Sequence, residues 1–102
     1  MTDKPKNRMK LEEQLEEKCC EYARSLGMVA VKLENVGMVG IPDRMFIKEG
    51  GKTLFVEFKN PNGKGVVSPE QKFWLKYLGD AGHVIDDFEV FKKLIDSIYM
   101  CI

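Results

Sequence analysis

The sequence predicts an α/β fold in which a mixed β-sheet carries helices on both sides, with elements in the order α-β-β-β-α-β-α. Three observations lead to this prediction. Apolar residues recur at helical spacing near both ends of the chain. Short β-branched and aromatic segments, separated by glycine-containing turns, fill the middle. A Ser-Pro-Glu-Gln segment at residues 68–71 carries the signals of a helix start.

The first helix is predicted over about residues 10–26, after a polar, basic arm at residues 1–8 that we expect to be disordered. Its apolar residues form one stripe at helical spacing: Leu11, Leu15, Cys19, Tyr22 and Leu26. Gly27 supplies the C-terminal stop. Glu12 and Glu16 lie on the border of this stripe, where a carboxylate could reach a site at the sheet edge.

Three strands are expected next, over residues 28–33, 44–48 and 53–59, with a glycine hairpin turn between the last two. Side chains alternate between the two faces of a strand. In the third strand, Val56 and Phe58 therefore point to one face, and Phe55, Glu57 and Lys59 point to the other.

The second helix is predicted to begin at Pro69, with Ser68 as its N-cap and Gln71 as the capping-box partner. Its apolar face is expected to comprise Phe73, Trp74, Tyr77 and Leu78. We expect Trp74 and Tyr77 to belong to the core rather than to stack on nucleic-acid bases.

A short strand over residues 83–85 and a last helix complete the predicted fold. Asp86 or Asp87 is placed to cap this helix. Its inward-facing residues are predicted to be Phe88, Phe91, Leu94, Ile95 and Ile98.

The residues with the clearest chemical meaning lie between the first and third strands. Asp43 follows Pro42, which forces the preceding residue into an extended conformation and so fixes where Asp43 points. Glu57 and Lys59 lie on the same face of one strand. Two carboxylates can hold a hard divalent cation, which polarises a phosphate and lowers the pKa of a bound water, while an ammonium group stabilises charge on the phosphate. An exposed Glu–Lys ion pair would explain Glu57 and Lys59, but it would not explain Asp43.

The order of these pieces resembles the virus-type replication-repair nuclease (VRR-NUC) domain of the PD-(D/E)XK nuclease superfamily. In this chain they are Glu12 and Glu16, Gly40-Ile41-Pro42-Asp43, Glu57-Phe58-Lys59 and Ser68-Pro69-Glu70-Gln71. The resemblance implies a restriction-endonuclease-like core with Mg²⁺ or Mn²⁺ as cofactor. It also implies that the Phe58 carbonyl is a further metal ligand and that Gln71 faces the site. The metal ligands are then expected to be Asp43, Glu57, Phe58 and one of Glu12 and Glu16, with Glu12 preferred.

Length and composition constrain the number of domains, the attraction to nucleic acid and the location of the protein. With 102 residues, we expect a single domain over residues 9–102. The formal net charge is zero, so the whole molecule does not attract nucleic acid. The three cysteines have no metal-ligand spacing, and no segment is long and apolar enough for a signal peptide or a membrane span. We therefore expect an intracellular, cytoplasmic protein, in the host cytoplasm if its source is a virus.

Together these features predict a metal-dependent DNA endonuclease that selects Holliday junctions or other branched DNA during replication or repair. Symmetric cutting of two strands favours a homodimer, with the apolar chain end at residues 98–102 in the interface. The candidate phosphate contacts are Lys32, Arg44, Lys64 and Lys72. The alternative is a catalytically weak DNA-binding or assembly module with the same fold.

Overall fold

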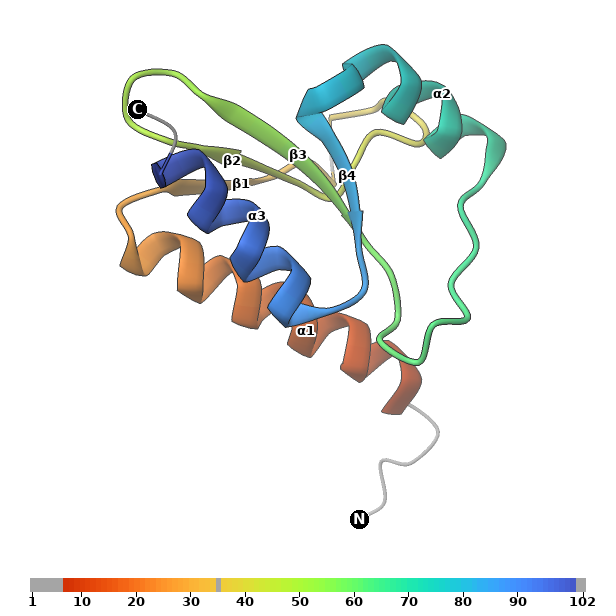
Figure 1. The fold of residues 1–102 in the computed structure, drawn as a ribbon. Coiled ribbons are helices and arrows are strands. Elements are labelled where there is room, and N and C mark those ends of the chain that lie inside the picture. Colours follow the sequence, from red (N-terminus) through yellow and green to blue (C-terminus); the bar gives the residue numbers. More distant parts are fainter. Residues whose placement is uncertain (1–6, 35, 101–102) are drawn as a thin grey trace.

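The computed structural model describes residues 7–34 and 36–100 and contains the predicted elements in the predicted order (Figure 1). They are α1 (Asn7–Ser25), β1 (Val29–Lys32), β2 (Arg44–Ile47), β3 (Thr53–Phe58), α2 (Pro69–Leu78), a 3-10 turn (Gly79–Ala81), β4 (Gly82–Ile85) and α3 (Phe88–Met100). The helix α1 begins at Asn7, within the segment predicted as an arm. The rest of that arm, residues 1–6, lies outside the described residues.

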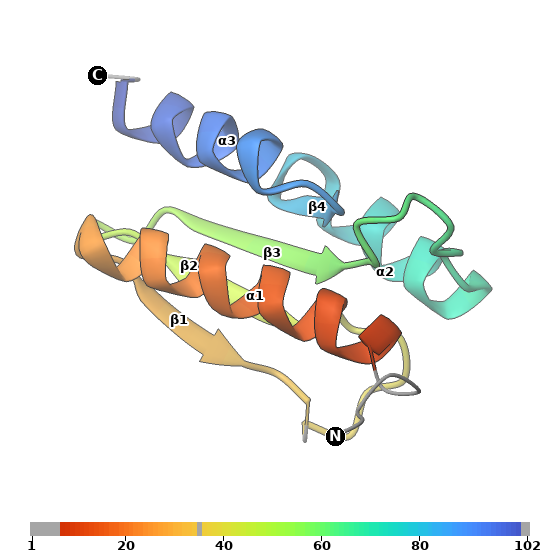
Figure 2. The same cartoon turned by 90° about the horizontal axis from the view of Figure 1, so that it is seen from below.

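The four strands form one mixed sheet in the order β1-β2-β3-β4. β1 pairs with β2 and β2 with β3 in antiparallel fashion, whereas β3 and β4 are parallel. Helices α1 and α3 lie side by side across one face of the sheet, as both views show (Figures 1 and 2). Helix α2, which lies between β3 and β4 in the chain, packs against β4 on the other side. The α/β fold with a mixed sheet is therefore confirmed.

The core fills the space between the sheet and the pair α1 and α3. Phe46, Phe58 and Phe91 are fully buried, and their rings contact one another with centroids 5.2–6.5 Å apart. Val56 is also fully buried, so the predicted alternation of β3 is confirmed. Cys19 of α1 is buried as predicted. Burying such side chains stabilises the fold by about 1.5–3 kcal/mol each.

Helix α2 departs from the prediction in its orientation. Trp74 and Tyr77 were expected in the core, but Tyr77 is 75% exposed, Trp74 is only partly buried and α2 has no buried residue. Leu78 of the predicted face does pack inward, and together with Leu75 it lies against Gly82 of β4. Together with Gln71 they form an i, i+4, i+7 stripe, which the neighbouring aromatic residues hid in the sequence.

Helix α3 turns its apolar stripe toward the core. Ile95 and Ile98 are buried, and the Tyr99 hydroxyl donates a hydrogen bond of 2.9 Å to the Leu26 carbonyl. Ile98 and Tyr99 of the predicted interface at residues 98–102 thus make contacts within the chain, while residues 101 and 102 lie outside the described residues. No helix among the described residues is long and apolar enough to cross a membrane.

Candidate active site

The antiparallel pairing of β2 and β3 brings the Pro-Asp turn beside the Glu-x-Lys segment. Arg44, the first residue of β2, is paired with Val56 of β3. Asp43 therefore lies beside the end of β3, where its Oδ2 accepts a 2.8 Å hydrogen bond from the backbone N–H of Phe58. Burial raises the pKa of the Asp43 carboxyl, and this backbone hydrogen bond partly offsets the shift.

The Glu57 carboxylate is almost completely shielded from solvent. Its residue is only 5% exposed, and it lies on the face of β3 opposite the core. Gln71 donates a 2.7 Å hydrogen bond through Nε2 to Glu57 Oε2, and Lys59 Nζ lies 3.3 Å from the same oxygen. Burial raises the pKa of Glu57 to about 7, and the nearby Asp43 carboxylate adds to the shift. A cation beside these two acids would relieve both effects.

Gln71 both caps α2 and contacts the site. Its backbone N–H donates to Ser68 Oγ, and its side-chain Oε1 accepts from the Ser68 backbone N–H, so the predicted capping box is present. The same Oε1 also accepts a 3.0 Å hydrogen bond from Lys59 Nζ. The start of α2 is therefore connected through one side chain to both Glu57 and Lys59.

The loop after β3 packs onto the aliphatic part of Lys59. A Cβ added at Gly65 would lie 2.8 Å from the Lys59 Cβ, which is too close for any larger residue to fit without a shift. The Lys59 side chain is only 16% exposed, although its ammonium group reaches Glu57 and Gln71. Gly65, which positions Lys59, was not among the residues predicted from the sequence. The available signal was a glycine three residues before the helix cap.

The two candidate acids of α1 occupy different surroundings. Glu16 Oε2 accepts a 2.6 Å charge-assisted hydrogen bond from Arg44 Nε, and Lys32 Nζ lies 3.5 Å from the same oxygen. Burial raises the pKa of Glu12, and Asp43 adds to that shift whereas Lys59 opposes it. Glu16 also raises the pKa of Asp43, so both acids are within electrostatic reach of the site. Glu12 acts on Glu57 as well, while Glu16 is engaged by Arg44.

The four predicted phosphate contacts divide into two pairs. The Arg44 side chain is 15% exposed and held by Glu16, and Lys32 lies 3.2 Å from Glu34 as well as close to Glu16. The structure therefore gives Arg44 a contact within the protein that the sequence analysis did not foresee. Lys64, in the loop after β3, and Lys72, on α2, are exposed.

The donor atoms around Asp43 and Glu57 suit a hard divalent cation. The carboxylates of Asp43, Glu57 and Glu12, with the backbone carbonyl of Phe58, are the oxygen ligands that Mg²⁺ and Mn²⁺ prefer. Burial raises the pKa of all three carboxyls, and neighbouring carboxylates add to each shift. A bound cation would lower these pKa values. Among residues 7–34 and 36–100, no three acidic, histidine or cysteine side chains are already grouped as a metal centre. The residues therefore fit such an ion in their chemistry, without forming a closed cage.

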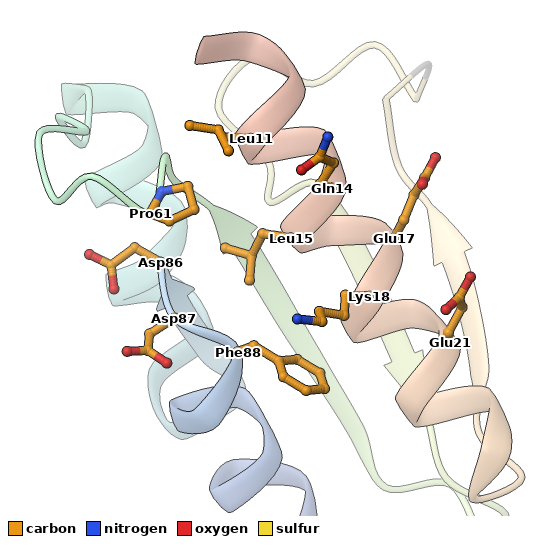
Figure 3. Close-up of a pocket in the computed structure, with 10 residues that line it drawn as sticks. All are labelled: Leu11, Gln14, Leu15, Glu17, Lys18, Glu21, Pro61, Asp86, Asp87 and Phe88. Atoms are coloured by element: carbon orange, nitrogen blue, oxygen red, sulfur yellow. The ribbon is translucent and has the colours of Figure 1, made fainter. Parts of the chain in front are cut away.

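A separate groove of about 550 Å³ lies between α1, Pro61 in the loop after β3 and the start of α3 (Figure 3). Leu11, Leu15 and Phe88 contribute apolar side chains to it. Its acidic lining residues are Glu17, Glu21, Asp86 and Asp87, with Lys18 the only basic one. Neither Asp43, Glu57 nor Lys59 lines this groove, and its acidic lining would repel phosphate. We therefore assign the site to the carboxylates at the end of β3, not to the groove.

The metal-free protein is expected to lose stability as the pH rises from about 4.5 to about 7. The pKa of Glu57 is raised from 4.5 to about 7 in the folded state. The unfolded chain therefore releases this proton first, and the contribution is lost as the pH rises through this window. The free energy of unfolding should fall by up to about 3 kcal/mol.

Urea unfolding in EDTA between pH 4 and pH 8.5 measures this loss, with Glu57→Gln as the matched variant. The other titrating groups are common to both proteins, so the difference between the two curves isolates Glu57 and its coupling to Asp43. The variant should gain stability relative to the parent above pH 7. Parallel curves over the whole range would mean that Glu57 titrates at its ordinary pKa.

Comparison with known proteins agrees with the fold. The sequence profile of the VRR-NUC domain matches residues 4–91. A solved structure of a VRR_NUC domain superposes with a TM-score of 0.69 and 25% sequence identity, covering 83% of this chain and 94% of that structure. The curated protein "Putative nuclease p44" of Acyrthosiphon pisum secondary endosymbiont phage 1 is 36% identical over 53 residues, which are 52% of this chain and 57% of that protein. The aligned part thus spans little more than half of this relative. From the profile match and the shared fold, we conclude that the chain belongs to the VRR-NUC family of nuclease domains.

Proposed function

We propose that this nuclease domain is a metal-dependent DNA endonuclease that hydrolyses phosphodiester bonds. The observation that carries the proposal is the buried Glu57 carboxylate, which is contacted by Lys59 and Gln71 and lies beside Asp43. Glu57 is only 5% exposed and lies close to other carboxylates, so keeping it ionised lowers the stability of the fold. A bound cation would offset this cost, because it stabilises the ionised carboxylates. Retention of Asp43, Glu57 and Lys59 together favours the enzyme over the non-catalytic DNA-binding or assembly module.

Each residue has a distinct part in this proposal. Asp43, Glu57 and Glu12, with the Phe58 carbonyl, would hold Mg²⁺ or Mn²⁺. When bound, the ion polarises the scissile phosphate and makes water a nucleophile near neutral pH. The Lys59 ammonium lies at the edge of the acid pair, where it can stabilise the growing negative charge on the phosphate. Gln71 fixes the position of Lys59 and Glu57 through its two hydrogen bonds.

We also propose that the preferred substrate is branched DNA, such as a Holliday junction, and that the active form is a homodimer. The support is the zero formal net charge, which gives one domain little attraction for a linear duplex. Two domains related by a two-fold axis would present two sites to a branched substrate and combine their exposed lysines, including Lys64 and Lys72.

Cleavage assays with labelled four-way junctions and matched linear duplexes test the proposal. We expect cleavage with Mg²⁺ or Mn²⁺, none in EDTA, and faster cleavage of the junction. Binding should weaken steeply between 50 and 200 mM salt. Metal-independent cleavage would contradict the assigned site. Junction binding without cleavage in either metal would favour the non-catalytic module, and equal cutting of both substrates would remove only the branched-DNA preference.

Glu12→Gln is expected to lower cleavage more than Glu16→Gln, by about tenfold or more. Both acids are electrostatically coupled to Asp43, but Glu12 is also coupled to Glu57, whereas Glu16 is engaged by Arg44. Glu16→Gln should mainly lower stability, since it leaves the poorly exposed Arg44 guanidinium without its carboxylate partner. Single-turnover cleavage and urea unfolding of both variants separate the two effects. Equal, full activity of both variants would remove α1 from the site, and the reverse order would make Glu16 the ligand.

A further inference from the structure

The loop that leads into β2 touches the first turn of α2 through Gly40. A Cβ added at Gly40 would lie 2.5 Å from Glu70 Cβ, and 2.6 and 2.8 Å from the backbone carbon and oxygen of Glu70. A second contact joins the same two segments, since Trp74 Nε1 donates a 3.1 Å hydrogen bond to the Val39 carbonyl. The loop and the helix therefore approach as closely as a residue without a side chain allows.

The contact lies one residue away from the side chain that connects α2 to the site. Glu70 directly precedes Gln71, so a shift of the Glu70 backbone also moves Gln71. Gln71 Nε2 donates its 2.7 Å hydrogen bond to Glu57, and Gln71 Oε1 accepts the 3.0 Å hydrogen bond from Lys59. Both bonds depend on how closely the first turn of α2 approaches the end of β3.

The loop is the firmly held partner in this contact, and α2 is the loosely held one. Pro42, two residues after Gly40, is fully buried. The Asp43 carbonyl accepts a 3.0 Å hydrogen bond from the Leu33 backbone N–H, and the Asp43 side chain accepts the bond from Phe58. Helix α2, in contrast, has no buried residue. A side chain added at Gly40 would therefore displace the helix rather than the loop.

We infer that Gly40 is a positioning residue that sets the place of α2, and through it holds Gln71 against Glu57 and Lys59. An added Cβ would require an ordinary separation of 3.4–4 Å from Glu70 in place of 2.5 Å. A shift of that size is enough to break hydrogen bonds that are now 2.7 and 3.0 Å long. The consequence for cleavage rests on the proposed function, whereas the placement of Gln71 does not.

Gly37 separates this role from the ordinary need for glycine in a turn. It lies in the same loop and has a φ of +79°, close to the +86° of Gly40, but a Cβ added there would meet nothing within 4 Å. Alanine at either position is strained to a similar degree by the backbone. Only Gly40→Ala also pushes against α2, so Gly37→Ala is the matched control.

Single-turnover cleavage with Mn²⁺ tests the inference on the parent, Gly40→Ala, Gln71→Ala and the double variant. We expect Gly40→Ala to lower the rate by about tenfold or more, because it displaces a group that positions Lys59. If Gly40 acts through Gln71, the double variant should lose no more than Gln71→Ala alone, within about twofold. Gly37→Ala should stay within about twofold of the parent. Urea unfolding checks that every variant is folded.

Trp74 supplies a readout that needs no cleavage, because it is the single tryptophan of the chain. In Gly40→Ala its fluorescence should shift to longer wavelength and be quenched more strongly by acrylamide, since the hydrogen bond to the Val39 carbonyl is lost. Gly37→Ala should give the parental spectrum.

Several results would overturn the inference. They are a parental rate and spectrum in Gly40→Ala, an equal loss of rate in Gly37→Ala, or losses in Gly40→Ala and Gln71→Ala that multiply in the double variant. A parent protein that does not cleave with either metal would overturn the proposed function instead. The same four proteins then decide the placement of Gln71 by urea unfolding, where strictly additive effects of Gly40→Ala and Gln71→Ala, with an unchanged Trp74 spectrum, would contradict it.

Discussion

Asp43→Asn and Glu57→Gln are each expected to abolish metal-dependent cleavage, by at least about 10³-fold, while leaving the protein folded. Both replacements keep the shape of the side chain and an oxygen that can accept the hydrogen bonds from Phe58 and Gln71. They remove the negative charge that a hard cation requires. Metal affinity should fall together with activity.

Two exposed acids provide matched controls for these variants. Asp80→Asn and Glu49→Gln make the same chemical changes away from the end of β3 and should cut at the parental rate. Single-turnover cleavage of a labelled junction and calorimetric titration with Mn²⁺ measure the two effects. In EDTA at pH 8, Glu57→Gln should be more stable than the parent, so loss of activity cannot be attributed to unfolding. Near-parental cleavage by either site variant would contradict the assignment.

Lys59→Met is expected to lower the rate of the chemical step by about 10²–10³-fold without loss of metal affinity. The methionine keeps the aliphatic stem on which Gly65 packs and removes only the ammonium group. Because Lys59 lowers the pKa of Glu57, its removal should raise that pKa further. The Mn²⁺ titration is therefore made at pH 8.5, where more of the Glu57 carboxyl is ionised than at neutral pH.

Lys52→Met is the control for this variant, since Lys52 is exposed in the hairpin between β2 and β3. It should cleave at the parental rate at low salt. A Lys59→Met protein that has lost its Mn²⁺ affinity at pH 8.5 would mean that Lys59 organises the acids and does not act on the phosphate. The acid variants and the lysine variant are thus distinguished by metal affinity, although all of them lose activity.

Much of the fold could be predicted from the sequence because it depends on local patterns. The alternation in β3 predicted that Val56 and Phe58 enter the core and that Glu57 lies on the other face. Ser68, Pro69 and Gln71 predicted the start of α2 and its capping box. Each of these features depends on residues no more than a few positions apart, so a single sequence contains the information needed.

The orientation of α2 could not be read in the same way. The predicted apolar face combined Leu78, which packs inward, with Phe73 and Tyr77, which are exposed, and it left out Leu75. Gly82 of β4 favours the observed orientation, because it leaves room for Leu75 and Leu78 against the strand. This choice depends on a contact across the sheet, which helical spacing does not contain.

By itself, the sequence determined the order of the elements and the family. It also predicted the candidate site residues Asp43, Glu57 and Lys59, because they lie in short motifs at strand ends. Only the tertiary structure decided which groups meet there. It brought Gln71 onto Glu57 and Lys59, placed Gly65 on the stem of Lys59 and paired Arg44 with Glu16. The physical reason is that local patterns fix backbone conformation and the inward face of a strand, whereas the pairing of distant side chains depends on how strands and helices pack together.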